Sequence, residues 1–117
     1  MTSPKPLPQL ATILLERRGR MLVITLNRPD QLNAVNLELH DDLVDPLWFA
    51  PCDTESDIVQ ITGAGRAFSA GGDIDHMARN AAEPWRFDHE ARIAKRIVST
   101  MLDIDKPVIC RMNGYAV

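Results

Sequence analysis

Residues 21–27 (MLVITLN) form a short run in which the first four side chains are all apolar. A strand that is apolar on both faces has to be covered on both faces, as in sheets that lie between other layers. A second apolar run at 11–17 precedes it, and Arg18-Gly19-Arg20 separates the two. This pattern predicts a β-hairpin.

The segment after this hairpin has helical periodicity. Asn36 is expected to cap a helix over residues 37–45, and Pro46 is expected to end or kink that helix because proline lacks an N–H and clashes with the preceding turn. Trp48 and Phe49 follow, and we expect both to plug the hydrophobic core rather than to line a ligand site.

The second half of the chain continues the alternation of strands and helices. Apolar runs at 57–62 and 106–112 predict two more strands. Asp73 can cap a short helix through residue 80, and Pro84 suits the first turn of a longer helix to residue 102. Three basic residues on that longer helix form a solvated face or contact a phosphate: Arg92, Lys95 and Arg96. The alternation predicts an α/β or spiral ββα fold.

Length, composition and charge limit the possible functions. The chain has 117 residues, which is at most one domain, and 13 basic against 16 acidic residues give a net charge of -3. Nucleic acid is therefore not an expected partner, since phosphate binding needs clustered positive charge. No apolar run reaches the roughly 20 residues of a membrane span, and the first residues lack a signal-peptide core. We expect a cytoplasmic protein with no membrane partner.

Two further expectations come from proline and cysteine. Residues 1–10 contain three prolines and are predicted to be a disordered lead, so the folded domain is expected over 11–117. Cys52 and Cys110 lack the spacing of a zinc site, and we expect both to be reduced and structural.

The glycine-rich segment 63–73 (GAGRAFSAGGD) lies between a predicted strand and a predicted helix. A dinucleotide-binding turn would need a third glycine at position 68, where Phe68 stands. A serine nucleophile at Ser69 lacks the G-x-S-x-G turn and a histidine with an evident orienting partner. The chain's histidines are therefore interpreted as surface or core residues: His40, His76 and His89.

The third interpretation of this segment is an anion-binding turn. Gly71 and Gly72 allow close backbone approach and positive φ, and they stand directly before the helix that Asp73 caps. Bare N–H groups at a helix start favour a negatively charged oxygen. A structural glycine turn has the same composition, so both interpretations remain open at this point.

Three ordered motifs together resemble the crotonase family, the enoyl-CoA hydratase/isomerase superfamily. They are NRP at 27–29 followed by LNA at 32–34, GAGRAFSAGGDI at 63–74, and KPVI at 106–109 followed by NGYA at 113–116. The resemblance implies an α/β fold of the ClpP/crotonase type, a spiral of ββα units, here truncated to its N-terminal part. It also implies assembly into trimers or paired trimers.

The resemblance implies acyl-CoA chemistry of the hydratase/isomerase (lyase) type, as in fatty acid metabolism, through a thioester enolate held by two backbone N–H groups. The first donor maps to Gly72, and Asp73 is expected to cap its helix rather than to transfer protons. Coenzyme A is part of the substrate, and no separate cofactor or metal is implied. The substrate-binding positions implied by the resemblance are Arg28, Gln31, Leu32, Ala34, Ala70, Gly71, Gly72, Asp73 and Ile74.

Two departures from the family pattern matter. Asp75 stands where the family often has a lysine that meets a CoA phosphate, so Arg28, Arg66 or a neighbouring subunit would have to supply that contact. Val117 precedes the glycine run that carries the second donor in the family, and also the glutamates that move protons. We therefore expect a truncated chain that is inactive alone. Two alternatives are a non-catalytic binding or oligomerisation module and, less favoured by these residues, a related serine peptidase.

Overall fold

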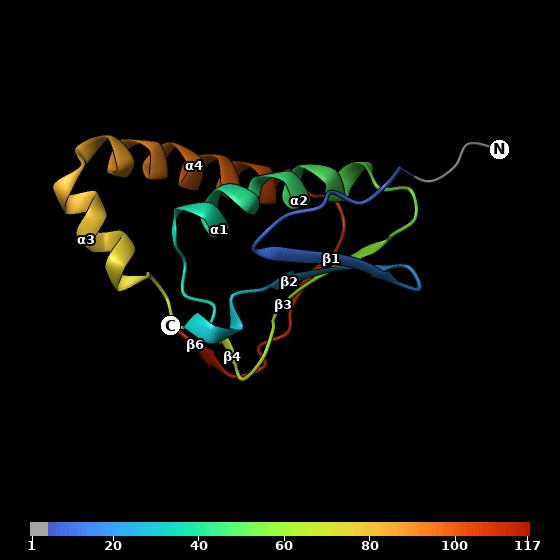
Figure 1. The fold of residues 1–117 in the computed structure, drawn as a ribbon. Helices are drawn as coiled ribbons and strands as arrows, with labels where there is room; N and C mark the ends of the chain where they lie inside the picture. The colour runs from blue at the N-terminus through green and yellow to red at the C-terminus, as the bar shows by residue number, and fades with distance from the viewer. Residues whose placement is uncertain (1–4) are drawn as a thin grey trace.

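The computed structural model describes residues 5–117, and its strands form two sheets that lie below a layer of helices (Figure 1). The larger sheet has the order β1-β2-β3-β5, and the smaller one pairs β4 with β6. The strands are β1 (Ile13–Arg18), β2 (Met21–Leu26), β3 (Ile58–Gly63), β4 (Ala67–Ser69), β5 (Val108–Cys110) and β6 (Tyr115–Ala116). The predicted α/β class is confirmed.

The predicted hairpin is present as the antiparallel pair β1 and β2, with Gly19 at φ +58 in the turn. β2 then pairs in parallel with β3, and β3 pairs in parallel with β5. Leu22, Val23 and Ile24 are all 0% exposed. Burial of three successive side chains places the middle of β2 under cover on both faces, as its apolar run predicted.

Two short helices cover the sheet, α1 (Leu37–Asp42) and α2 (Val44–Phe49). Asn36 caps α1 as expected, because its side chain accepts a hydrogen bond from the Leu39 N–H at 2.9 Å. The break between the helices falls after Asp42, four residues before Pro46. In an unbroken helix the N–H of residue 46 would donate to the Asp42 carbonyl, but proline has no N–H. Pro46 therefore produces the predicted kink one turn upstream of itself.

The core lies between this helical layer and the larger sheet. Its buried members are Ile13, Leu22, Ile24, Leu47, Phe49, Ala50 and Val59. Phe49 plugs the core as expected, but Trp48 is 71% exposed, so the prediction for Trp48 is wrong. Adjacent positions on a helix point about 100° apart, and the face of α2 that packs on the sheet excludes Trp48.

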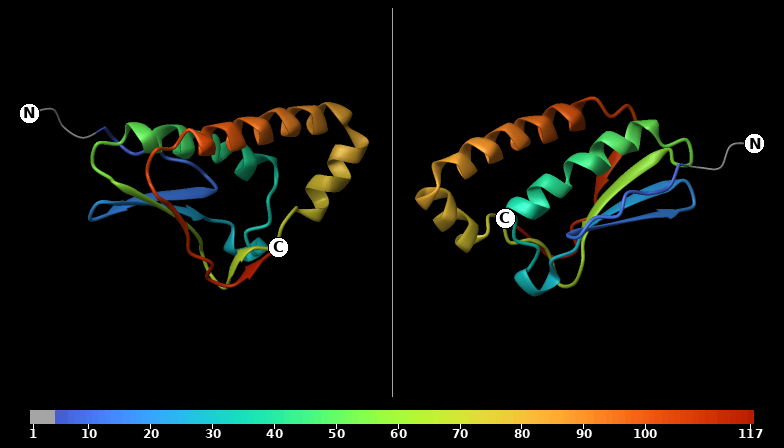
Figure 2. Two further views of the ribbon diagram at one scale, coloured as in Figure 1. Left: turned by 180° about the vertical axis from the view of Figure 1, so that it is seen from behind. Right: turned by 45° about the horizontal axis from the view of Figure 1, so that its top comes forward.

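The two remaining helices also begin where the sequence predicts. Asp73 caps α3 (Ile74–Ala82), and α4 (Pro84–Leu102) starts at its proline. α4 packs along α1 and α2, while α3 joins the region of the short sheet to the far end of α4 (Figure 2). On α4, Ile97 and Met101 pack against the core, whereas Val98 and Leu102 are exposed.

The proline-rich lead falls partly outside the described residues, since the structure begins its description at Lys5. Residues 5–10 have no helix or strand, but Leu7 and Leu10 pack against the core. The described residues also include two short 3-10 helices, η1 (Pro29–Gln31) and η2 (Ala50–Cys52). Within residues 5–117, no helix is both long and apolar enough to cross a membrane.

Candidate functional site

The turn that carries Gly72 is held against the loop before α1 by two backbone hydrogen bonds. The Val35 N–H donates to the Gly71 carbonyl at 2.7 Å, and the Asp73 N–H donates to the Val35 carbonyl at 3.0 Å. This is a parallel bridge between Val35 and Gly72. In such a bridge the hydrogen bonds to Val35 are made by the residues on either side of Gly72, which are Gly71 and Asp73. The N–H of Gly72 itself therefore points away from Val35.

The Gly72 amide is free to meet a ligand. Gly72 is exposed, and across residues 5–117 its N–H donates to no backbone or side-chain acceptor. Gly71 has φ +90, which only glycine adopts without strain, and this conformation turns the next peptide outward. The structure therefore places an unpaired amide hydrogen at the start of α3.

Asp73 fixes the start of that helix. Its carboxylate accepts from the His76 N–H at 3.0 Å and from Arg28 Nη2 at 3.2 Å. The hydrogen bond from His76 and the nearby guanidinium of Arg28 together hold the pKa of Asp73 below its usual value. A carboxylate engaged in this way is a helix cap, as the sequence predicts.

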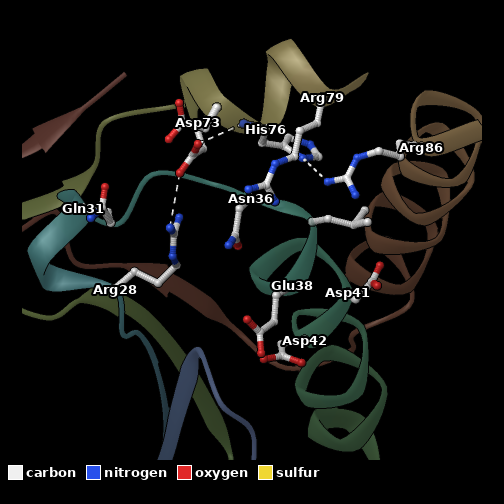
Figure 3. A pocket seen from close by; sticks show the side chains of 12 residues that line it. Arg28, Gln31, Asn36, Glu38, Asp41, Asp42, Asp73, His76, Arg79 and Arg86 are labelled. Carbon is white, nitrogen blue, oxygen red and sulfur yellow. Dashed lines mark hydrogen bonds and ion pairs between the residues drawn. The ribbon is translucent and has the colours of Figure 1, made fainter. Parts of the chain in front are cut away.

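Arg28 joins the two segments of the site. One guanidinium nitrogen donates to the carbonyl of Ala34, and another donates to Asp73 (Figure 3). The Arg28 side chain is 16% exposed. Its charge is therefore already matched inside the protein, at the junction between the loop 31–35 and α3.

Asn33 is a site residue that sequence reasoning missed. It is fully buried at φ +55, and its side-chain nitrogen donates to the carbonyls of Ala64 and Ala67 at 2.9 and 2.8 Å. Its side-chain oxygen accepts from the Arg28 N–H at 2.8 Å. The available signal is the residue type, because asparagine tolerates the left-handed conformation better than other non-glycine residues.

A small cavity of about 220 Å³ lies beside Gly72. Its lining is Gln31, Ala34, Gly72, Asp73, Ile74 and Asp75. Five of the nine residues implied by the resemblance thus meet around one space, and Arg28 lines the larger cavity next to it. The other three act through their backbone: the Ala70 N–H donates to the Leu32 carbonyl at 2.9 Å, and the Gly71 carbonyl holds Val35.

The larger neighbouring cavity has a volume of about 610 Å³ and lies between α1, α3 and the start of α4 (Figure 3). It shares Gln31, Asp73 and Asp75 with the small cavity, so the two spaces adjoin. Its lining is Arg28, Gln31, Asn36, Leu37, Glu38, Asp41, Asp42, Asp73, Asp75, His76, Arg79 and Arg86. Arg79 and Arg86 have no signal in the sequence, because the α3–α4 turn is needed to bring them together.

The C-terminal strand runs beside the same turn. The Val117 N–H donates to the Ser69 carbonyl at 3.0 Å, and Val117 O lies 3.5 Å from where a Cβ on Gly71 would stand. The Ser69 hydroxyl is also engaged, since it donates to the Asn33 carbonyl and accepts from the Gly71 N–H. This arrangement makes Ser69 a structural residue and gives no support to a serine nucleophile.

Two of the three histidines pair with carboxylates on neighbouring helices. His76 is 4% exposed and lies 3.0 Å from Glu90, and His89 lies 3.0 Å from Asp41. Burial lowers the pKa of His40. Within the part of the chain that the structure describes, no group of three or more histidine, cysteine or acidic residues is arranged to hold a metal ion. Cys52 and Cys110 are free thiols, and both are exposed.

Comparison with known proteins identifies the family. The model of the enoyl-CoA hydratase/isomerase family matches residues 21–117. A 2,3-dehydroadipyl-CoA hydratase of Escherichia coli is 35% identical over 107 residues, which are 92% of this chain and 40% of that protein. A small ribosomal subunit protein, mS47 of Schizosaccharomyces pombe, is 31% identical over 105 residues, 88% of this chain and 24% of that protein. The crystal structure of an enoyl-CoA hydratase/isomerase from Mycobacterium paratuberculosis superposes with a TM-score of 0.85 at 37% identity, over 92% of this chain and 43% of that one.

Proposed function

The chain belongs to the enoyl-CoA hydratase/isomerase family, and we propose that it forms the first half of a site that binds and activates an acyl-CoA thioester. It spans 40% of the length of the E. coli hydratase that it resembles. The proposal therefore concerns the complete protein in which these residues act. Coenzyme A enters as part of the substrate, without a separate cofactor.

The observation that carries this proposal is the free amide of Gly72. In enolate-forming thioester chemistry, negative charge develops on the thioester oxygen in the transition state. A donor that is already fixed in place stabilises that charge without reorganising, and one such donor changes kcat by about 10² to 10³. The Val35 bridge and the cap at Asp73 hold the Gly72 peptide in one orientation, so we assign it as the first oxyanion donor.

The groove residues follow from the small cavity. Gln31, Ala34 and Ile74 line it together with Gly72, and we propose that they contact the CoA portion and the thioester. Val117 leaves the short sheet next to Gly71. A segment that continued in that direction would pass the free amide, which is where the family resemblance requires the second donor. We also propose a homotrimer or hexamer in the cytoplasm, hydratase or isomerase (lyase) turnover in the complete protein, and none in residues 1–117 alone.

The test removes the Gly72 N–H while keeping the backbone in place as far as possible. Gly72→Pro eliminates the donor, and Gly72→Ala keeps it. The three atoms nearest to a Cβ at this position all belong to the Met77 side chain, at 3.4 to 3.8 Å, which is ordinary contact, so the alanine variant is a matched control for the fold. With crotonyl-CoA, we expect kcat of the proline variant to fall by about 10² or more and that of the alanine variant to change little.

Two further measurements separate the donor's effect from misfolding. Circular dichroism and binding of free CoA should be alike in the two variants. The bound thioester carbonyl, labelled with ¹³C, should shift downfield in the alanine variant and not in the proline variant. Equal turnover in both variants would refute the assignment of Gly72.

A second candidate function has one specific observation in its favour. The relative mS47 is a ribosomal subunit protein by name, so a chain of this similarity can serve as a component of an assembly. For this chain the alternative is a non-catalytic binding or oligomerisation module. Absence of any acyl-CoA binding by the complete protein, together with a stable complex of defined stoichiometry in light scattering, would favour the module.

A further inference from the structure

α3 is attached to the rest of the fold through polar side chains. Within this helix only His76 is buried and only Asn80 is half-buried, while its other residues are exposed in the structure of residues 5–117. The helix therefore gains little stability from buried apolar area. Its position depends instead on hydrogen bonds, which weaken steeply when their length or angle changes.

His76 makes the buried contact between α3 and α4. Its side chain is 4% exposed, and its Nε2 lies 3.0 Å from a carboxylate oxygen of Glu90 on α4. An Nη of Arg86 lies 3.4 Å from the other ring nitrogen, Nδ1 (Figure 3). Because a guanidinium only donates, Nδ1 accepts, and the ring proton on Nε2 is donated to Glu90. Asn80 donates to the same Glu90 oxygen and supports this bond.

The backbone of His76 is tied to the turn that carries Gly72. Its N–H donates to the Asp73 carboxylate at 3.0 Å, so His76 belongs to the capped first turn of α3. Gly72 directly precedes Asp73, and a shift or rotation of α3 would move both. Arg28 and Val35 hold this turn from the side of the loop before α1. His76 is the buried contact that holds it from the side of α4.

We propose that His76 is a positioning residue for the Gly72 amide. By bonding Glu90, its side chain fixes α3 against α4, and thereby fixes the direction in which the Gly72 N–H meets the thioester carbonyl. This inference rests on the proposed function, because it needs Gly72 to be the donor. A misplacement of about 1 Å can cost about 10²-fold in rate. Loss of the interhelical bond should therefore lower kcat through the backbone of α3.

The test measures turnover of crotonyl-CoA by the complete protein and its variants. His76→Leu removes both ring nitrogens, and His76→Gln keeps an N–H group at a similar distance from the backbone as Nε2. Glu90→Ala removes the same bond from the α4 side and serves if His76→Leu does not fold. His89→Leu is the matched control, because His89 makes a contact of equal length, 3.0 Å to Asp41, that joins α4 to α1 and not to α3.

We expect kcat of His76→Leu and of Glu90→Ala to fall by about tenfold or more, with KM changed by less than about threefold. His76→Gln should recover most of the loss, and His89→Leu should match the unmodified protein. In a Gly72→Pro background, His76→Leu should change kcat by less than about twofold, because the donor that it positions is already gone. The downfield ¹³C shift of the bound thioester carbonyl should be reduced in His76→Leu and kept in His89→Leu.

Three results would overturn the positioning role while leaving Gly72 as the donor. They are unchanged kcat in both His76→Leu and Glu90→Ala, an equal loss from His76→Leu with and without Gly72→Pro, and a loss of helical circular dichroism in both disruptive variants. The last result would mean that the bond only keeps α3 folded. An unmodified protein that neither binds nor converts crotonyl-CoA would instead overturn the proposed function, and the role of His76 with it.

Discussion

Replacement of Asn33 by alanine should be among the most destabilising single changes in this chain. The substitution leaves the partly buried Arg28 N–H and Ala64 carbonyl without their partners. Each orphaned group costs about 1 to 3 kcal/mol. Alanine at φ +55 adds about 1 to 2 kcal/mol of backbone strain. The Ala67 carbonyl keeps its bond from Asn113, so it is not orphaned. We therefore expect a loss of about 3 to 8 kcal/mol.

Asn113 provides a matched comparison, since its side chain also makes three hydrogen bonds to the same turn. It donates to the Gly65 and Ala67 carbonyls and accepts from the Gly63 N–H. Asn113 is exposed, so water replaces those partners when it is shortened. Asn113→Ala should cost about 1 kcal/mol or less.

The assay is urea unfolding of the purified chain, followed by circular dichroism and tryptophan fluorescence. A loss of this size is a large part of the roughly 5 to 15 kcal/mol typical of a domain, so Asn33→Ala is expected to approach complete unfolding. Asn33→Gly, which accepts positive φ, should be about 1 kcal/mol less destabilising and gives a measurable value. Equal losses for Asn33→Ala and Asn113→Ala would show that burial of the amide is not what stabilises this turn.

The other predictions use the same unfolding assay. Gly63→Ala should cost several kcal/mol or prevent folding, because its Cβ would stand 2.6 and 2.7 Å from two backbone carbonyl oxygens. Gly72→Ala is the control and should be nearly neutral for stability. Similar losses of stability for both variants would contradict the steric argument. Burial by itself would raise the pKa of Asp53, but hydrogen bonds from an arginine and a serine lower it below 3.8. The stability that Asp53 contributes is thus present above about pH 4 and lost as pH falls through its folded pKa, so Asp53→Asn should flatten the acid limb of the stability profile. Lys106→Met should cost about 2 kcal/mol, because Lys106 Nζ donates to two backbone carbonyls at 2.7 and 2.6 Å, and the exposed Lys95→Met should cost nearly nothing.

The elements that the sequence predicted correctly are those with local causes. Asn36 and Asp73 cap helices through hydrogen bonds to residues three positions later, and Pro46 breaks the helix one turn upstream. Each of these signals acts within a single turn, so residue type and spacing are sufficient to read it. Which face of a short helix packs on the sheet depends on distant residues, and the prediction that Trp48 lies in the core is wrong because its side chain is exposed to solvent.

The features that the sequence did not predict depend on distant partners. β4 and β6 have three and two residues and exist because they pair with each other across the chain. Asn33 bonds to carbonyls 31 and 34 positions away. Arg79 and Arg86 meet at one cavity because α3 and α4 fold back on each other. Periodicity over a short window contains no information on such contacts, which arise only after the elements have packed.

The two sequence motifs around the site are one physical unit. Four residues of the loop before α1 bond the glycine-rich turn: Arg28 bonds Asp73, Leu32 bonds Ala70, Asn33 bonds Ser69, and Val35 bonds both Gly71 and Asp73. Among residues 70–73, these contacts and the Ser69 hydroxyl engage the N–H groups of Ala70, Gly71 and Asp73, and the Gly72 N–H is left without an acceptor. The Gly72 peptide is therefore held by residues about 40 positions earlier in the sequence, through the Arg28 side chain and the backbone of Leu32, Asn33 and Val35. The proposed oxyanion donor is a backbone amide and has no side chain of its own to vary, so the loop before α1 is one place where this site can be adjusted. For this reason, substitutions in that loop should alter thioester activation even at positions that touch no ligand.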